Sequence, residues 1–358
     1  MKTSITIACG GTGGHIHPAI AVADELRKAG YPLSLILSGT RDAERKTAET
    51  WQGPLLQSGA RPMRHLVANG FAILKCIRFL KKQRSTVLFA TGGYTSFAPV
   101  MAARLLRIPV VFHEANSLAG SAIRVCSKYL NIAAVATSFE ETAAQLPWAK
   151  TVFTGLPLRQ AVLDTLAKAR TVEKPAGRFS ILVTGGSQGA HGMNLLVAPV
   201  LASLAKSDAH VRILHQCGKH DLEGLQETYA AVADQVTLTA FIDDMGTAYG
   251  QADMVIARAG AATCFEIARC AVPTIFIPLP TAADDHQRKN AEALVRCGGA
   301  ICLDQYTTTP AQLADAVRSL YSDAAMREQM RAAFADLPQP NAAKAVADLI
   351  CAIAEPAQ

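Results

Sequence analysis

The stretch TSITIACGGTGGH (residues 3–15) is the most informative about the fold, because an apolar run leads directly into a glycine-rich turn. Residues 3–9 predict a buried strand, and Pro18 to Ala29, ended by Gly30, predicts the helix that follows. A turn of this kind exposes backbone N–H groups at a helix N-terminus, where they can bind an anion.

The same unit of strand, glycine turn and helix occurs twice more, as TVLFATGGYTS (86–96) and FSILVTGGSQG (179–189). A single turn of this kind can be no more than a tight connection between a strand and a helix. Three of them, spread over both halves of the chain, indicate two phosphorylated ligands or one ligand held between two domains.

The length and the order of elements predict two domains. A chain of 358 residues exceeds what one hydrophobic core usually supports. Strand-like and helix-like segments alternate throughout, which predicts α/β architecture with two doubly wound, Rossmann-like domains facing a cleft. The Gly- and Pro-containing segment 155–159 breaks this alternation. We therefore expect a first domain over 1–155, joined by a C-terminal helix (Ala342 to Ala354, within 341–358) that crosses back to it, and a second domain over 156–340.

The composition excludes several classes of protein. Half of the residues are apolar and 18% are charged, as in a folded globular protein. Nine cysteines with no C-x-x-C pair favour reduced thiols over a disulfide scaffold or a zinc ribbon. A net charge of +6 is too small for a dedicated nucleic-acid binder but permits anionic ligands or an anionic membrane surface. No apolar run is long enough to predict a membrane span.

The glycine turns do not match the common nucleotide motifs. A dinucleotide fingerprint that began at Gly11 would need a glycine where Ile16 stands. A P-loop would need Ser or Thr after Gly218-Lys219, but His220 follows. The zinc-protease motif fails because Ser117 stands where its second histidine should be. An NAD enzyme, a P-loop NTPase and a zinc hydrolase are therefore each contradicted at a required residue.

The stretch ADMVIARAGAATCFE (252–266) predicts a phosphate-binding helix start. A strand ends at Arg258, Gly260 turns the chain, and the backbone N–H groups of Ala261, Ala262 and Thr263 begin a helix. Glu266 offers carboxylate oxygens that can accept both hydroxyls of a ribose. The alternative is that Glu266 is an ordinary acid complementing the helix dipole.

Three further groups of residues are candidates for the site. In TAADDHQRKN (281–290), His286 and Gln287 could bond sugar hydroxyls, or the stretch is a solvated helix start capped by an aspartate. His15 has the chemistry of a general base near neutral pH, or is a histidine bonded locally at a helix start. The segment 113–116 could line the same cleft or form a buried network.

A segment between Asn69 and Ser85 predicts an amphipathic helix, with Phe71, Leu74, Ile77, Phe79 and Leu80 on one face among lysines and arginines. Such a helix can lie on anionic lipid. The alternative is that its apolar face packs on the sheet of its own domain.

Taken together, the motifs resemble glycosyltransferase family 28, and within it the bacterial N-acetylglucosaminyltransferases of peptidoglycan synthesis. The resemblance covers essentially the whole chain. Besides the three glycine turns it rests on His113-Glu114-x-Asn116, Gly155-x-Pro157-x-Arg159, Phe241-Ile242-Asp243-Asp244-Met245, Arg258-x-Gly260-Ala261-x-Thr263-x-x-Glu266 and Asp284-Asp285-His286-Gln287-x-x-Asn290. The chain departs from the family at Ala115, where family members commonly carry Gln.

The resemblance implies a glycosyltransferase B fold and a set of site residues. His15 would be the catalytic base. UDP-GlcNAc would be bound by Thr12, Gly13, Gly14, Asn116, Arg159, Ser187, Ile242, Ala261, Ala262, Thr263, Cys264, Phe265, Glu266 and Gln287. No metal and no cofactor are implied.

The resemblance also implies an activity and a location. The enzyme would be an inverting transferase that moves GlcNAc from UDP-GlcNAc to the C4 hydroxyl of MurNAc in undecaprenyl-pyrophosphoryl-MurNAc-pentapeptide (lipid I), giving lipid II. It would act on the cytoplasmic face of the bacterial membrane as a peripheral protein, with an anionic membrane surface and other cell-wall synthesis proteins as partners and no nucleic acid. Two alternatives stay open: a UDP-GlcNAc 2-epimerase, and a non-enzymatic subunit that binds a nucleotide sugar.

Overall fold

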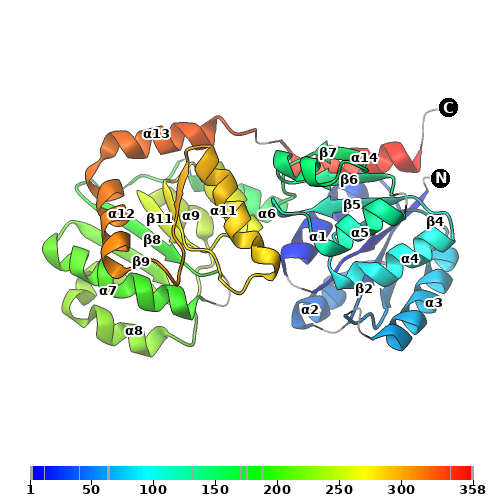
Figure 1. Ribbon diagram of the computed structural model, residues 1–358, viewed down its shortest axis with the longest axis horizontal. Coiled ribbons are helices and arrows are strands. Elements are labelled where there is room, and N and C mark those ends of the chain that lie inside the picture. The colour runs from blue at the N-terminus through cyan, green and yellow to red at the C-terminus, as the bar shows by residue number, and fades with distance from the viewer. Residues whose placement is uncertain are drawn as a thin grey trace. The chain divides into compact units, whose positions relative to one another are not determined.

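The computed structural model of the chain describes residues 3–11, 13–39, 41–62, 65–130, 132–169, 171–174, 176–186, 189–338 and 340–355. The chain divides into two compact units: unit 1 (Met1–Gln160 with Gln339–Gln358) and unit 2 (Ala161–Pro338) (Figure 1). Each unit contains a parallel sheet, so the predicted class of two parallel α/β domains is confirmed. None of the helices in the described part of the chain combines the length and apolarity needed to cross a membrane.

Unit 1 contains a parallel sheet of seven strands in the order β3-β2-β1-β4-β5-β6-β7. The strands are β1 (Ser4–Ala8), β2 (Leu33–Leu37), β3 (Leu55–Gln57), β4 (Ser85–Ala90), β5 (Val110–Glu114), β6 (Ala134–Thr137) and β7 (Thr151–Phe153). The helices are α1 (Gly13–Lys28), α2 (Asp42–Thr50), α3 (Leu66–Gln83), α4 (Phe97–Leu105), α5 (Ser121–Tyr129) and α14 (Ala342–Ala354).

Helices cover both faces of this sheet. In β4, Val87 and Phe89 belong to the core shared with α1 and α14, whereas Leu88 and Ala90 belong to the core shared with α3 and α4. This alternation follows from the two-residue period of a strand. Burial on both faces explains why the strands are almost continuously apolar in the sequence. The C-terminal helix α14 packs on α1.

Unit 2 contains a parallel sheet of six strands in the order β10-β9-β8-β11-β12-β13. The strands are β8 (Phe179–Thr184), β9 (Val211–Gln216), β10 (Val236–Thr239), β11 (Met254–Ala257), β12 (Thr274–Phe276) and β13 (Ala300–Cys302). The helices are α6 (Gln160–Ala169), α7 (His191–Ser207), α8 (Leu222–Tyr229), α9 (Met245–Gln251), α10 (Ala261–Cys270), α11 (His286–Arg296), α12 (Pro310–Ser322) and α13 (Ala324–Ala335).

The expected start of α1 and the expected end of β5 are wrong. Helix α1 begins at Gly13, five residues before the predicted start at Pro18. Pro18 therefore lies inside the helix, where its ring nitrogen has no N–H to donate. The apolar run Val110–Phe112 predicts a strand that ends before His113, but β5 extends through His113 and Glu114. Both polar side chains are buried in this strand.

The apolar stripe predicted in the segment 69–85 is divided between two faces of α3. Leu80 is buried, and Ile77 and Phe79 are half-buried against the core of unit 1. Phe71 and Leu74 are exposed on the other side of the helix. The prediction of a single face is therefore wrong, and only the N-terminal half of α3 presents apolar side chains to solvent.

Candidate functional site

The first glycine turn is held by a buried carboxylate from α2. Glu44 is 1% exposed, and its carboxylate accepts hydrogen bonds from the backbone N–H of Gly11 (2.6 Å) and of Gly39 (2.5 Å). The Ser38 hydroxyl lies 2.7 Å from both carboxylate oxygens. A Cβ on Gly10 would lie 2.5 Å from Glu44 Oε1, so a larger residue does not fit there. The Gly11 amide, expected to be open to a ligand anion, is therefore already bonded to an internal one.

His15 lies in the first turn of α1 and faces the second glycine turn. A Cβ placed on Gly93 would lie 3.5 Å from His15 Nε2. Gly93 has a φ of +72°, a conformation that favours glycine. His15 also contributes electrostatically, after burial, to lowering the pKa of His113 in β5. Gly13 and Gly14 belong to the same helix start, whereas Thr12 lies outside the described residues.

The segment 113–116 forms a buried network. Glu114 accepts hydrogen bonds from the backbone N–H (2.9 Å) and side-chain amide (3.3 Å) of Asn116 and from the backbone N–H of Gly120 (2.7 Å). Burial raises the pKa of Glu114 despite these bonds. Burial also lowers the pKa of His113 to about 4, and its Nε2 lies 3.1 Å from the Ser138 hydroxyl. The network holds Asn116, which is itself half-buried, beside the end of β5.

Cations line cavities formed by the described residues of unit 1. One, of about 490 Å³, is lined by Arg41, Arg45 and Arg61 together with Tyr94 of the second glycine turn. Another, of about 390 Å³, is lined by Arg159 with residues of α1 and α2, including His17, Arg27, Lys46 and Trp51. Arg159, predicted to contact the nucleotide, is exposed and belongs to unit 1.

Unit 2 contains a cavity of about 510 Å³ beyond the carboxyl ends of β8 and β11. The strand order reverses between these two strands, which is where open α/β sheets bind ligands. The third glycine turn, the start of α10 and the segments after β12 and β13 contribute to the cavity wall. The lining residues are Gly185, Gly186, Gly189, Ala190, His191, Gly192, Arg258, Gly260, Thr263, Leu279, Pro280, Thr281, Gln287, Gln305 and Tyr306.

Arg258 is a cavity residue to which the sequence assigned no role. It is 7% exposed and donates to the carbonyls of Ile277 and Pro278 at 2.9 Å each and to Gln305 Oε1 at 2.6 Å. Burial lowers its pKa to about 10, which leaves the guanidinium charged at neutral pH. Its buried Nε has no hydrogen-bond partner among the described residues.

The start of α10 has no capping side chain at its N-cap among the described residues. Gly260 precedes the helix and has no side chain to cap the N–H groups of 261–263. Thr263 lines the cavity, Ala262 is exposed, and Cys264 is fully buried in the core. Ala261, Phe265 and Glu266 are half-buried, and Glu266 accepts a hydrogen bond from the buried Tyr249 hydroxyl at 3.2 Å.

Of the remaining predicted residues of unit 2, one lines the cavity and another does not. Gln287 lines the cavity, and its Oε1 accepts a hydrogen bond from the Leu279 N–H at 3.0 Å. Ile242 is half-buried between β10 and α9 and is outside the set of residues that line the cavity. Ser187 lies outside the described residues.

Both units match models of one protein family. The N-terminal domain model of glycosyltransferase family 28 matches residues 5–135, and the C-terminal domain model matches residues 180–348. The chain belongs to glycosyltransferase family 28.

Relatives of this family 28 chain extend over its whole length. It is 36% identical to the UDP-N-acetylglucosamine–N-acetylmuramyl-(pentapeptide) pyrophosphoryl-undecaprenol N-acetylglucosamine transferase of Geobacter sulfurreducens, over 96% of this chain and 97% of that protein. The crystal structure of Acinetobacter baumannii MurG matches with a TM-score of 0.82 and 32% identity, over 97% of this chain and 99% of that one. The predicted family and glycosyltransferase B fold are thereby confirmed.

A related architecture occurs in another enzyme class. The UDP-GlcNAc 2-epimerase from Neisseria meningitidis, bound to UDP-GlcNAc, matches with a TM-score of 0.67 and covers 98% of this chain and 99% of that one. Its sequence identity is 15%, so this likeness concerns the fold alone.

Proposed function

We propose that this family 28 enzyme moves GlcNAc from UDP-GlcNAc to the C4 hydroxyl of MurNAc in lipid I, giving lipid II with inversion at the anomeric carbon. The observation that carries the proposal is the 36% identity, along nearly the whole of both chains, to a transferase of that name. The 32% identity and close structural match to a MurG enzyme support the same assignment.

The donor diphosphate is assigned to the cavity of unit 2. The uncapped N–H groups of Ala261, Ala262 and Thr263 would bond its oxygens, and the helix dipole adds about half a positive charge at that end. The buried Nε of Arg258, which has no hydrogen-bond partner among the residues that the structure describes, would supply a further donor. Ser187 would contact the nucleotide from the third glycine turn.

The rest of the donor is assigned to residues around this cavity. Glu266 would accept the ribose hydroxyls, with one oxygen oriented by Tyr249. The backbone of Ile242 would bind the uracil, and Cys264 and Phe265 would contribute backbone only, since the Cys264 side chain is buried in the core. Gln287 would bond a GlcNAc hydroxyl.

Residues of unit 1 are assigned to the GlcNAc group and the acceptor. Thr12, Gly13, Gly14 and Asn116 would surround the GlcNAc, and Arg159 would contact the nucleotide. Because Glu44 already occupies the Gly11 amide, the acceptor diphosphate is assigned to the arginine-lined cavity beside Tyr94.

His15 is assigned the role of general base. As the C4 oxygen of the acceptor bonds to the anomeric carbon, His15 would take the hydroxyl proton and the bond from that carbon to the UDP oxygen would break. The amides at the start of α10 would stabilise the negative charge that develops on the departing UDP. A base of this kind typically contributes about 10²–10⁴-fold to the rate.

The exposed apolar side chains of unit 1 support a peripheral position on the cytoplasmic face of an anionic membrane. Leu66, Val67, Phe71 and Leu74 of α3 are 77%, 75%, 63% and 51% exposed, and Lys75 and Arg78 follow on the same helix. Apolar side chains among cations are typical of helices that bind anionic lipid. Such a surface would hold the enzyme beside its lipid-linked acceptor and other cell-wall synthesis proteins.

The test is UDP release by the purified chain from UDP-GlcNAc, with and without a short-chain lipid I analogue. We expect release only with the acceptor, and a loss of about 10²-fold or more in kcat for His15→Asn. His210→Asn, an exposed histidine of unit 2, is the matched control and should keep full turnover. Epimerised UDP-GlcNAc without an acceptor would indicate the epimerase alternative, and a pure chain that binds UDP without turnover would indicate the binding subunit.

A further inference from the structure

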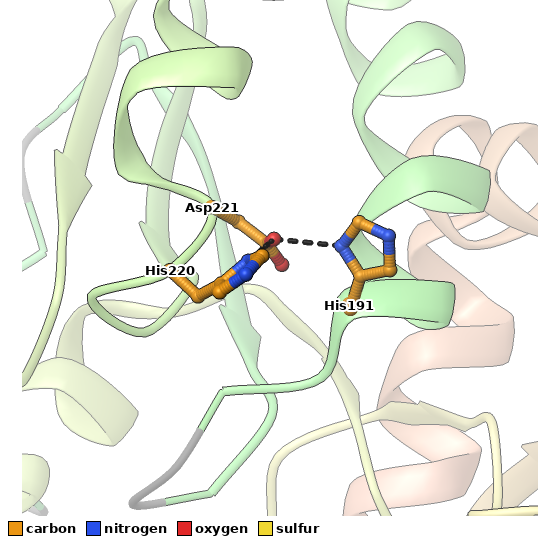
Figure 2. A group of neighbouring side chains, drawn as sticks. All are labelled: His191, His220 and Asp221. Carbon is orange, nitrogen blue, oxygen red and sulfur yellow. Dashed lines mark hydrogen bonds and ion pairs between the residues drawn. The ribbon is translucent and has the colours of Figure 1, made fainter.

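Two histidines and an aspartate from separate segments of unit 2 converge on one point (Figure 2). His191 begins α7, whereas His220 and Asp221 follow β9 and precede α8. Asp221 Oδ1 lies 2.7 Å from His191 Nδ1 and 3.2 Å from His220 Nδ1. The three ligand atoms all lie within 4.8 Å of one another.

The carboxylate of Asp221 is oriented toward this point by the protein. Asp221 is the residue before the first turn of α8, a position where an aspartate usually caps its own helix, yet it makes no such bond. Its Oδ2 instead accepts a hydrogen bond from the buried Asn194 amide at 2.6 Å. Asn194 is fixed in turn by the carbonyl of Cys217 (2.9 Å) and by His215 Nε2 (3.1 Å). This arrangement resembles the outer hydrogen bonds that orient metal ligands.

The two segments are also held close together by their backbones. Gly189 approaches Cys217 so closely that a Cβ on Gly189 would lie 2.2 Å from the Cys217 carbonyl oxygen. The side chains of His191 and His220 are nevertheless 64% and 91% exposed, so an ion from solvent can reach both rings. The site therefore combines a buried, positioned carboxylate with two accessible imidazoles.

We propose that His191, His220 and Asp221 form a binding site for one zinc-class transition-metal ion. Imidazole nitrogens favour zinc, cobalt, nickel or copper, whereas magnesium and calcium prefer oxygen ligands. Tetrahedral zinc places neighbouring ligand atoms about 3.3 Å apart, so the present separations need only small side-chain rotations. Each neutral imidazole binds the ion through Nδ1 when its proton is on Nε2.

The proposed ion would connect the third glycine turn to the loop after β9. His191 ends the segment that follows this turn and also lines the cavity of unit 2. A metal bound to it would restrain that wall of the cavity. The inference does not rest on the proposed sugar transfer, because none of the three ligands is assigned to bind the donor or the acceptor or to transfer the proton.

The test is titration of the full-length, reduced chain with Co²⁺ in chelator-free buffer, followed by visible absorption and then by competition with Zn²⁺. We expect one Co²⁺ per chain, displaced by Zn²⁺ and not by Mg²⁺, without the near-ultraviolet absorption of a thiolate–cobalt bond. His191→Gln and His220→Gln should each weaken binding more than tenfold, since even the loss of an outer hydrogen-bond partner costs about 10–100-fold. His210→Gln, an exposed histidine of the same unit outside the cluster, is the control and should bind as the wild type does.

Any one of three results would overturn the proposal. The wild type would bind no Co²⁺, or the wild type and its three variants would all bind Co²⁺ equally well. In the third result, the bound Co²⁺ would show a thiolate band and would still bind after each of the two cluster substitutions. Because His191 and His220 are exposed, their glutamine variants should fold normally, and matching far-ultraviolet spectra without metal would exclude unfolding as the cause of lost binding.

Discussion

Replacing Glu44 by glutamine should destabilise unit 1 although the shape of the side chain hardly changes. The carboxylate accepts from two backbone N–H groups and from the Ser38 hydroxyl inside the protein. Glutamine keeps one acceptor oxygen, so its NH₂ group would face one of the two N–H donors. A buried unpaired N–H costs about 1–3 kcal/mol, and the remaining bonds lose their charge assistance. We expect a loss of about 2–4 kcal/mol.

Tryptophan fluorescence during urea unfolding measures this loss in unit 1 alone. The chain has two tryptophans, Trp51 and Trp148, and both belong to unit 1. For a unit of this size the expected loss should lower the midpoint by about 1 M urea at unchanged slope. Glu49→Gln, an exposed acid on the same helix, is the control and should remain within about 0.5 kcal/mol of the wild type. An unchanged midpoint for Glu44→Gln, or equal losses in both variants, would refute the assigned role of Glu44.

Three further predictions concern a buried histidine, the donor site and the lipid surface. The pKa of His113 is about 4 in the folded protein, below its ordinary 6.5, so between these values the unfolded chain binds a proton that the folded chain does not. Unit 1 should therefore lose stability as pH falls from about 6.5 toward 4. Unfolding followed by tryptophan fluorescence should show a smaller loss in His113→Gln. Glu266→Ala should weaken UDP binding by roughly 2–3 kcal/mol in calorimetry, since two charge-assisted bonds to the ribose are lost, and unchanged affinity would reject its ribose role. The double variant Phe71→Ser/Leu74→Ser should bind anionic vesicles about tenfold more weakly, or more weakly still. Leu195→Ser changes an exposed leucine of unit 2 and should leave vesicle binding unchanged. Equal losses of vesicle affinity in both proteins would contradict the assigned surface.

Much of the fold follows from patterns that are local in the sequence. The strand Met254–Ala257 and the helix Ala342–Ala354 have the bounds that their apolar runs and flanking turn residues predict. The start of α1 and the end of β5 differ because tertiary contacts override a local signal. Pro18 predicts a helix start but lies inside α1, and two polar residues extend β5 beyond its apolar run.

The candidate site was less predictable than the fold. The amides of 261–263 could be found because a glycine at a strand-to-helix junction is a local signal. Arg258, Gln305 and Glu44 had no such signal, since Arg258 bonds Gln305 across 47 residues and Glu44 bonds Gly11 across 33. Glu44 in particular lies in a helix of charged and polar residues whose pattern predicts only a solvated surface.

The junctions that look alike in the sequence therefore differ in what their amides can bind. At the first turn an internal carboxylate already satisfies the Gly11 N–H, so binding a phosphate there would bring two anions together. At the start of α10 the preceding residue is a glycine without a capping side chain. The charged Arg258, whose Nε has no hydrogen-bond partner in the described part of the chain, lines the same cavity. Both junctions place a glycine between a strand and the N-terminus of a helix. Whether such a junction binds a ligand depends on the charge that the rest of the fold places against it.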